Sequence, residues 1–265
     1  MNNISATHRA FVRALIHLAL LSFALLGAGA GPAFALTPAA AGLKAVTDKA
    51  SGLTGYQDAS GAWVISPRFR SGADFDHGLA IVEDRAGESA LIDTQGNVRL
   101  QGVESAIWVS LPTMTEAKLS EGLLALRAQA SGKVGFVDAE GRWVIRPRFA
   151  DAFEFHEGLA AFRMRENGPV GFIDTRGRVV IAAKFGTRFR SPPVFAEGLA
   201  AVGLNDLWPR TNLDPPGKLG YIDRRGRWVI APKYANGESF VDGRAKVMQG
   251  EREVVITRPD GAAKR

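Results

Sequence analysis

A phrase of fifteen residues recurs along the chain. It occurs in full at 55–69 (GYQDASGAWVISPRF), 135–149 (GFVDAEGRWVIRPRF) and 220–234 (GYIDRRGRWVIAPKY). Residues 171–185 are a fourth copy that lacks the Trp and the Pro, and residues 90–104 are a degraded fifth copy. A segment this short cannot bury an apolar face alone, so the repetition predicts small, similar units that pack on one another.

A second phrase, Gly-Leu-Ala-x-Val, accompanies the first. Its copies lie at 78–82, 122–126, 158–162 and 198–202, with weaker matches at 42–46 and 243–247. The distance from Gly42 to Gly55 equals that from Gly122 to Gly135, so the first copy has the spacing of the later ones. Counted from this phrase, the chain holds about six units, and the last is truncated after a frayed copy of the first phrase at 255–261.

Both phrases predict β-strands joined by turns. Gly-aromatic-Ile-Asp is a short run that favours β-structure, and Asp-x-x-Gly is a turn in which Asp caps the backbone and Gly supplies positive φ. Trp-Val-Ile returns as a second strand that Pro ends, and Gly-Leu-Ala-x-Val is a third. The unit is therefore expected to be a three-stranded antiparallel meander of about 28 residues plus a connector.

The expected fold class is all-β, with tandem meanders forming a curved array that is either open or closed like a propeller. Closure is favoured because the chain starts with a third strand and ends with a copy of the first, so that joining its ends would complete a unit. An open array would instead need these partial units as caps.

The recurring Trp and Gly resemble the WG-repeat family over essentially all of residues 42–261. The copies at 55–69, 135–149 and 220–234 are the specific matches. The resemblance implies a β-rich bacterial repeat protein, often exported, that serves as an interaction module. It implies an architecture and no catalytic residue.

Residues 1–35 have the pattern of a secretory signal peptide, which leaves residues 36–265 as the repeat domain. Arg9 and Arg13 precede an apolar run at 14–30, and Gly31-Pro-Ala-Phe-Ala35 is a small-x-small cleavage site. The alternative is an uncleaved membrane anchor. Cleavage lowers the formal charge from +6 to +4, because the segment holds two Arg and no acid. We expect a periplasmic or secreted protein with no transmembrane segment after cleavage.

The sequence predicts no catalytic, cofactor or metal site. The chain has no Cys, so thiolate chemistry and disulfides are excluded. Each Asp-x-x-Gly turn carries one Asp in a capping position, whereas calcium needs several oxygen ligands from one loop. Nucleic acid is a disfavoured partner because the charge is low and the chain has an export signal. The recurring Trp is expected in the core, because the position of Trp63, Trp143 and Trp228 is Val98 and Val179 in other copies.

Two features are candidates for binding a partner, either an unknown protein or an anionic envelope polymer. The first is a basic repeat position, whose alternative role is a solvated edge that discourages aggregation. The second is the pair of long connectors, about 102–120 and 205–218, whose Trp side chains bind a partner or fold back onto a repeat. The residues are Arg68, Arg148, Lys184 and Lys233 in the basic position, and Trp108 and Trp208 in the connectors.

The function expected from these features is an exported, non-catalytic repeat scaffold for protein or cell-envelope interactions. One alternative is an envelope-glycan hydrolase that takes carboxylates from different repeats. The other is a structural spacer.

Overall fold

The computed structural model describes residues 42–105, 118–186, 192–204 and 218–259. These residues belong to one compact unit, Thr37–Arg265. They form β-strands, turns and bends, with no helix among them. Within this part of the chain, no helix is long and apolar enough to cross a membrane. Trp108 and Trp208 lie outside the described residues.

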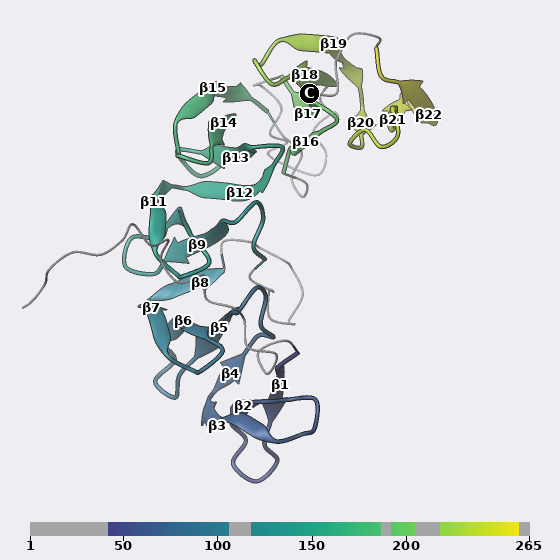
Figure 1. The fold of residues 1–265 in the computed structure, drawn as a ribbon. Helices are drawn as coiled ribbons and strands as arrows, with labels where there is room; N and C mark the ends of the chain where they lie inside the picture. The colour runs from purple at the N-terminus through teal and green to yellow at the C-terminus, as the bar shows by residue number, and fades with distance from the viewer. Residues whose placement is uncertain (1–41, 106–117, 187–191, 205–217, 260–265) are drawn as a thin grey trace, which may run out of the picture. The chain divides into compact units, whose positions relative to one another are not determined.

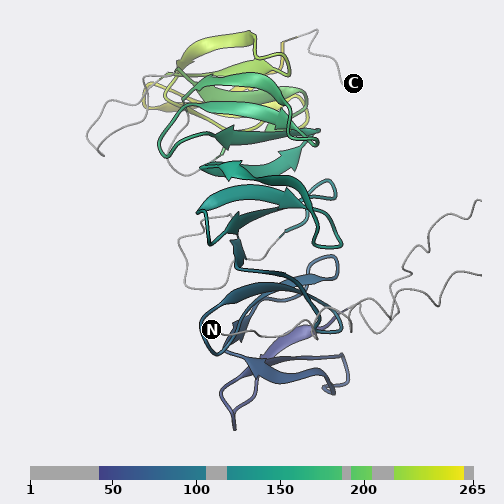
Figure 2. The same ribbon diagram turned by 90° about the vertical axis from the view of Figure 1, so that its left-hand side faces the viewer.

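The described residues form six antiparallel sheets, numbered here in chain order (Figures 1 and 2). Sheet 1 holds β1 (Lys44–Thr47), β2 (Thr54–Gln57) and β3 (Trp63–Phe69). Sheet 2 holds β4 (Ser71–Gly72), β5 (Leu79–Glu83), β6 (Ser89–Asp93) and β7 (Val98–Gln101). Sheet 3 holds β8 (Val103–Ser105), β9 (Leu124–Ala128), β10 (Lys133–Val137) and β11 (Trp143–Phe149).

The remaining sheets follow the same order. Sheet 4 holds β12 (Asp151–His156), β13 (Leu159–Arg163), β14 (Val170–Asp174) and β15 (Val179–Phe185). Sheet 5 holds β16 (Phe195–Ala196), β17 (Leu199–Gly203), β18 (Leu219–Asp223) and β19 (Trp228–Tyr234). Sheet 6 holds β20 (Asn236–Gly237), β21 (Arg244–Gln249) and β22 (Arg252–Thr257). The all-β class and the tandem antiparallel meanders are thus confirmed, while closure of the array stays a prediction.

The meander has four strand positions where the sequence predicted three. The expected connector contributes a short lead strand, which pairs with the Gly-Leu-Ala strand in sheets 2 to 6. We call the positions a (lead), b (Gly-Leu-Ala), c (Gly-aromatic-Ile-Asp) and d (Trp-Val-Ile). Sheet 1 lacks a and sheet 6 lacks d among the described residues. A single residue, such as Arg70 or Ala150, separates a d strand from the a strand of the next sheet at four of the five junctions, while residues 186–194 separate β15 from β16.

The d strand lies unusually close to the c strand because it contains bulges. Val134 pairs with Phe149 and Phe136 with Ile145, so three residues of β11 lie opposite one residue of β10, Gly135. A Cβ built on Gly135 would lie 2.4 Å from the Ile145 carbonyl oxygen and 2.7 Å from the Pro147 nitrogen. Equivalent contacts recur at Gly55, Gly171 and Gly220, where glycine lets two backbones approach, while sheet 2 has Ala90 at this position and pairs it in register with Gln101.

The a and b strands are joined by two-residue turns with positive φ at both positions. Glu157 and Gly158, with φ of 52° and 76°, join β12 to β13 as a type I′ turn. The same geometry recurs with His77, Glu121, Glu197 and Asp242 before the glycine. A side chain that crowds its own carbonyl in this conformation costs about 1–2 kcal/mol, so Glu needs a compensating interaction.

That interaction is a hydrogen bond to the next sheet. The Glu121 carboxylate accepts the Gly158 N–H at 2.9 and 3.1 Å. Glu157 accepts the Gly198 N–H at 2.9 Å, and Glu197 accepts the Gly243 N–H at 3.0 and 3.2 Å. Each glutamate therefore offsets its local strain by binding the a–b turn of the following unit.

The core lies between consecutive sheets. The described residues form five buried clusters, one between each pair of neighbouring sheets. In four of them an aromatic ring of a c strand packs on a phenylalanine of the next unit. These pairs, with centroids 4.6–4.9 Å apart, are Tyr56–Phe75, Phe136–Phe155, Phe172–Phe195 and Tyr221–Phe240. Packing between sheets is thus the main source of stability, as expected for a repeat array.

Gly135→Ala should destabilise the protein by about 2–3 kcal/mol, because the new methyl group meets backbone that cannot move aside. Gly132→Ala is the control: its φ is 62° and nothing lies within 4 Å of its Cβ position, so about 1 kcal/mol of conformational cost is expected. Thermal or urea unfolding measures both. Equal losses would mean that the close approach of the c and d strands is unimportant.

Glu157→Asn should destabilise the protein although Asn suits a type I′ turn better, because its shorter side chain no longer reaches Gly198. The expected net loss is about 1 kcal/mol, from a charged hydrogen bond minus the relief of strain. Asp242→Asn tests the turn alone, since Asp242 accepts no hydrogen bond from another described residue. It should leave the unfolding free energy unchanged or raise it. If Glu157→Asn also raises the unfolding free energy, the hydrogen bond from Gly198 to Glu157 does not stabilise the protein.

Candidate functional site

The recurring tryptophans lie at the start of the d strands, and the prediction that they form core was wrong for Trp63 and Trp228, which are exposed, while Trp143 packs at the edge of a buried cluster. The side chain of Trp63 is 39% exposed and Trp228 is 36% exposed. Val98 and Val179 at the same position are 51% and 56% exposed, and Trp143 is half-buried. The exchange of Trp for Val therefore reflects an outward β position that accepts either residue.

The ring of the Trp covers the crowded glycine of the c strand. Atom Cζ3 of Trp63 lies 2.8 Å from a Cβ built on Gly55, and Trp143 lies at the same distance from that of Gly135. Because glycine has no side chain, the inner edge of the indole fits against the backbone, while the outer edge of the indole faces solvent. Trp228 also packs edge-on against Phe185 of sheet 4, at 5.4 Å between centroids.

A row of exposed apolar side chains follows from this geometry. Every d strand, from β3 to β19, presents at least one at its start. We call these residues the outer-strand row: Trp63, Val64, Val98, Val144, Val179, Val180 and Trp228. Large exposed apolar groups that recur at the first two positions of the d strands mark a candidate interaction surface.

The basic position predicted for partner binding lies near the end of the d strands and contacts the protein itself. Arg68 donates from Nη2 to the Gly96 carbonyl at 2.5 Å, and Arg148 donates in the same way to Gly177. These glycines belong to the c–d turn of the following sheet. Both guanidinium groups also lie over the adjacent Phe ring, about 5 Å from its centroid. The two arginines therefore join consecutive sheets.

Lys184 and Lys233 occupy the same position without a hydrogen bond to a described residue. Their ammonium groups lie 5.2 Å from the centroids of Phe185 and Tyr234. A row of four equivalent cations is thus replaced by two bonded arginines and two lysines held over aromatic rings.

The turn aspartates cap the backbone, as their spacing indicates. Oδ1 of Asp174 accepts the N–H groups of Arg176 and Arg178 at 3.0 and 2.9 Å, while Oδ2 accepts Nε of Arg178 at 2.7 Å. Asp138 and Asp223 do the same with Arg142 and Arg227. Among the described residues, no group of three or more His, Asp or Glu could hold a metal ion.

These contacts lower the pKa of the turn aspartates. Partial burial alone would raise the pKa of Asp138, but the backbone N–H and the guanidinium of Arg142 hold it below its usual value. The pKa values of Asp174 and Asp223 are lowered for the same reasons. The carboxylates therefore remain charged at neutral pH as turn caps, unlike a general acid, whose pKa is raised.

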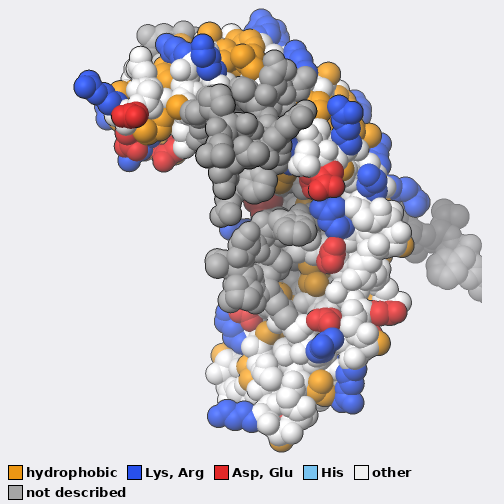
Figure 3. Space-filling model, turned by 180° about the vertical axis from the view of Figure 1, so that it is seen from behind, with side chains coloured by type: hydrophobic (Ala, Val, Ile, Leu, Met, Phe, Trp, Pro, Cys, Tyr) orange, Lys and Arg blue, Asp and Glu red, His pale blue; other side chains and the backbone are white. Residues whose placement is uncertain are grey.

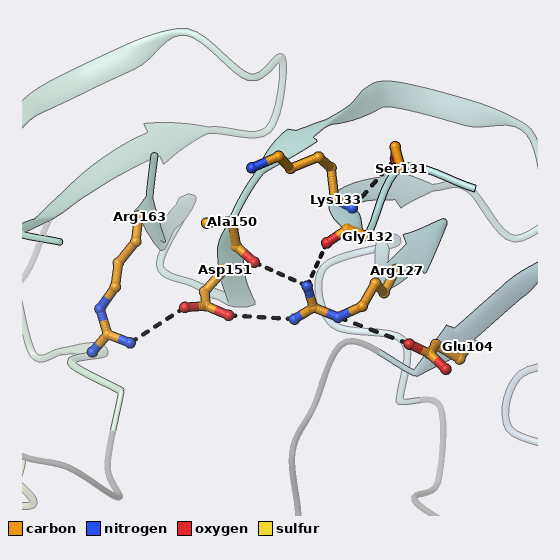
Figure 4. A network of polar contacts seen from close by, with 8 residues as sticks. All are labelled: Glu104, Arg127, Ser131, Gly132, Lys133, Ala150, Asp151 and Arg163. Atoms are coloured by element: carbon orange, nitrogen blue, oxygen red, sulfur yellow. Dashed lines mark hydrogen bonds and ion pairs between the residues drawn. The ribbon is translucent and has the colours of Figure 1, made fainter. Parts of the chain in front are cut away.

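A network of charged groups connects sheets 3 and 4 (Figure 4). Arg127 of β9 donates to the Gly132 and Ala150 carbonyls at 2.7 and 3.0 Å, and to Oδ1 of Asp151 at 3.3 Å. Arg163 of β13 reaches Oδ2 of Asp151 at 3.5 Å, and Glu104 lies 4.0 Å from Nε of Arg127. Burial lowers the pKa of Arg163, and Asp151 opposes that effect. Asp151 thus connects two arginines of neighbouring sheets in a structural role.

Some of these features have a signal in the sequence beyond the two recurring phrases. Phe75, Phe155, Phe195 and Phe240 each lie three residues before the glycine of the a–b turn, which marks the ring that packs on the previous sheet. The Arg127–Asp151–Arg163 network has no such signal. Glu83 and Gly203 occupy the equivalent of Arg127 and Arg163 in sheets 2 and 5, so the network belongs to one junction.

The sequence matches the pattern of the WG containing repeat family at residues 55–85, 135–167 and 220–252. The chain carries WG repeats. The matches start at the glycines that the d strand crosses, so the family pattern coincides with the crowded glycine, the exposed Trp and the turns between them. No curated protein matches the sequence.

Several solved structures resemble the WG-repeat chain weakly. A computationally designed protein, Ika8, is 11% identical over 81% of this chain and 67% of that one, with a TM-score of 0.41. A eukaryotic initiation factor is 16% identical, and the match covers 80% of this chain and 58% of that one at a TM-score of 0.41. A streptogramin B lyase is 14% identical, and the match covers 74% of this chain and 70% of that one at a TM-score of 0.34. These likenesses carry no argument about activity.

Acid should destabilise the WG repeats below about pH 4, the ordinary pKa of Asp. A lowered pKa in the folded state contributes stability that is complete above the ordinary value and is lost as the pH falls through the folded value. Thermal melts from pH 7 to pH 2.5 measure this loss. Asp174→Ala should lower the melting temperature at pH 7, and the gap from wild type should narrow by about half or more at pH 2.5. A gap independent of pH would show that the charge of Asp174 is irrelevant.

Proposed function

We propose that this protein is an exported WG-repeat scaffold that binds a protein or cell-envelope partner and performs no catalysis itself. The observation that carries the proposal is the outer-strand row. Its residues recur at the first two positions of the d strands and leave large apolar surface in water. Tryptophan is also enriched among residues that dominate binding energy at protein interfaces.

The architecture supports this assignment. Stability comes from contacts between neighbouring sheets, so an outward residue can change without loss of the core. The polar clusters within the described residues serve turns or junctions between sheets, and the turn carboxylates are held charged. The secretory pattern of residues 1–35 supports export, with cleavage after Ala35.

The expected outcome of a capture experiment is loss of a partner when the exposed Trp residues are replaced. The chain is expressed with its own N-terminus, recovered from the periplasm with Leu36 as its first residue by mass spectrometry, and used as bait in envelope extract. Trp63→Val and Trp228→Val together should reduce the captured partner by about fivefold or more. Val is the replacement because the chain itself places Val98 and Val179 at this position.

Trp143→Val is the matched control, because Trp143 is half-buried and should matter less to a partner. Melting temperatures verify that each variant is folded. Loss of the partner only in Trp108→Ala with Trp208→Ala would place binding on the long connectors and contradict a role for the outer-strand row. Absence of any specific partner would contradict the scaffold and favour a structural spacer, and hydrolysis of an envelope glycan would contradict the non-catalytic assignment.

A further inference from the structure

Positive charge increases toward the last complete repeats. The phrase at 55–69 has one basic and one acidic residue, and that at 90–104 has one basic and two acidic. The phrase at 171–185 has three basic residues against one acidic, and that at 220–234 has four against one. The modest formal charge of the whole chain, +6, therefore conceals a basic surface in sheets 4 and 5.

This excess is concentrated in two c–d turns. Arg176 and Arg178 lie in the β14–β15 turn, and Arg224, Arg225 and Arg227 lie in the β18–β19 turn. Arg178 and Arg227 form ion pairs with the turn aspartates, at 2.7 Å in both cases. Arg176, Arg224 and Arg225 are exposed and form no ion pair with any other described residue. Within the described part of the chain, three of the five guanidinium groups thus have no carboxylate partner.

The two turns lie on neighbouring sheets that touch. A Cβ built on Gly226, in the β18–β19 turn, would lie 2.8 Å from Cγ2 of Ile181 in β15. Trp228 packs on Phe185 at the end of the same strand. Arg224 extends to within 3.4 Å of the Cβ position of Gly158, in the a–b turn of sheet 4. The arginines of both turns therefore belong to one continuous surface.

Exposed apolar groups accompany these arginines. Val179 and Val180 directly follow Arg178, and Trp228 directly follows Arg227. They are 56%, 46% and 36% exposed. On the face in Figure 3, lysine and arginine side chains alternate with hydrophobic ones along the upper right margin of the described surface. We call the combination the arginine-turn surface: Arg176, Arg178, Val179, Val180, Arg224, Arg225, Arg227 and Trp228.

We propose that the arginine-turn surface binds an acidic protein segment that also carries apolar side chains. The inference rests on the proposed scaffold function and names its partner class. Guanidinium groups pair with carboxylates in a two-pronged geometry, and Arg with Trp is the combination most typical of energetic centres at protein interfaces. The aliphatic Val179 and Val180 favour a protein over an anionic polysaccharide, because a sugar polymer offers carboxylates but few apolar groups to cover them.

The test measures fluorescence anisotropy of a labelled random copolymer of glutamate and tyrosine with the chain from Leu36 to Arg265. Polyglutamate of equal length and polygalacturonate are the comparison probes. The copolymer should bind about fivefold or more tightly than either of them at 50 mM salt, and less tightly at 300 mM salt because part of the attraction is screened. Equal binding of polygalacturonate and the copolymer would overturn the assignment to a protein segment.

Arg176→Gln, Arg224→Gln and Arg225→Gln together should weaken copolymer binding about tenfold, as expected from the loss of several charged contacts. The control is Lys49→Gln, Arg85→Gln and Lys218→Gln, which removes the same charge at exposed positions outside the arginine-turn surface. It should weaken binding by less than about threefold, the part due to net charge. Equal losses in the two triple variants would overturn the site.

Val179→Thr with Val180→Thr keeps the branched shape and removes part of the apolar character. This variant should lower copolymer affinity to that of polyglutamate and leave polyglutamate binding unchanged. Unchanged copolymer binding would overturn the apolar half of the proposal. If the copolymer fails to bind while envelope capture still depends on Trp63 and Trp228, the arginine-turn surface fails and the scaffold stands.

Discussion

The close approach of the d strand to a glycine of the c strand organises the four sheets that carry Gly55, Gly135, Gly171 and Gly220. At Gly135 no side chain fits, because three residues of β11 cross over this single position. The bulges that produce this approach also end the regular ladder. The chain then reaches the next sheet after one residue, as at Ala150. The lack of a Cβ atom at Gly135 thus allows both the close approach of β10 and β11 and the short connection to the next sheet.

The same approach explains why Trp is exposed. The indole needs a flat surface without side chains beneath it, and the glycine supplies one. The exchange of Trp for Val suggests burial when the sequence is considered alone, but both residues are also favoured on the outward face of a strand. The fact that a position accepts both Trp and Val therefore does not distinguish a core position from a solvent-facing one.

Local chemistry accounts for what could be predicted. An Asp that caps its own turn, with Gly at a positive φ, requires only neighbouring residues, so the c–d turns and the strands beside them were predictable. The lead strands were missed because a pair such as Ser71–Gly72 is too short to show a period and pairs only in the folded chain. The ion pair of Arg127 with Asp151 depends in the same way on two sheets meeting, whereas Arg163 pairs with Asp151 across two strands of one sheet.

The c–d and a–b turns lie at the same end of each sheet, since Leu159 after the a–b turn pairs with Asp174 before the c–d turn. The a–b turns use their carboxylates between sheets, as Glu157 does with Gly198. The aspartates of the c–d turns are likewise committed to their own backbone. Most acidic groups at this end, with Asp242 as an exception, therefore form hydrogen bonds or ion pairs inside the structure, while Arg176, Arg224 and Arg225 form no ion pair with a described residue. A repeat array with modest net charge can in this way carry a local surface of basic and apolar side chains, while the residues that determine its fold stay the same.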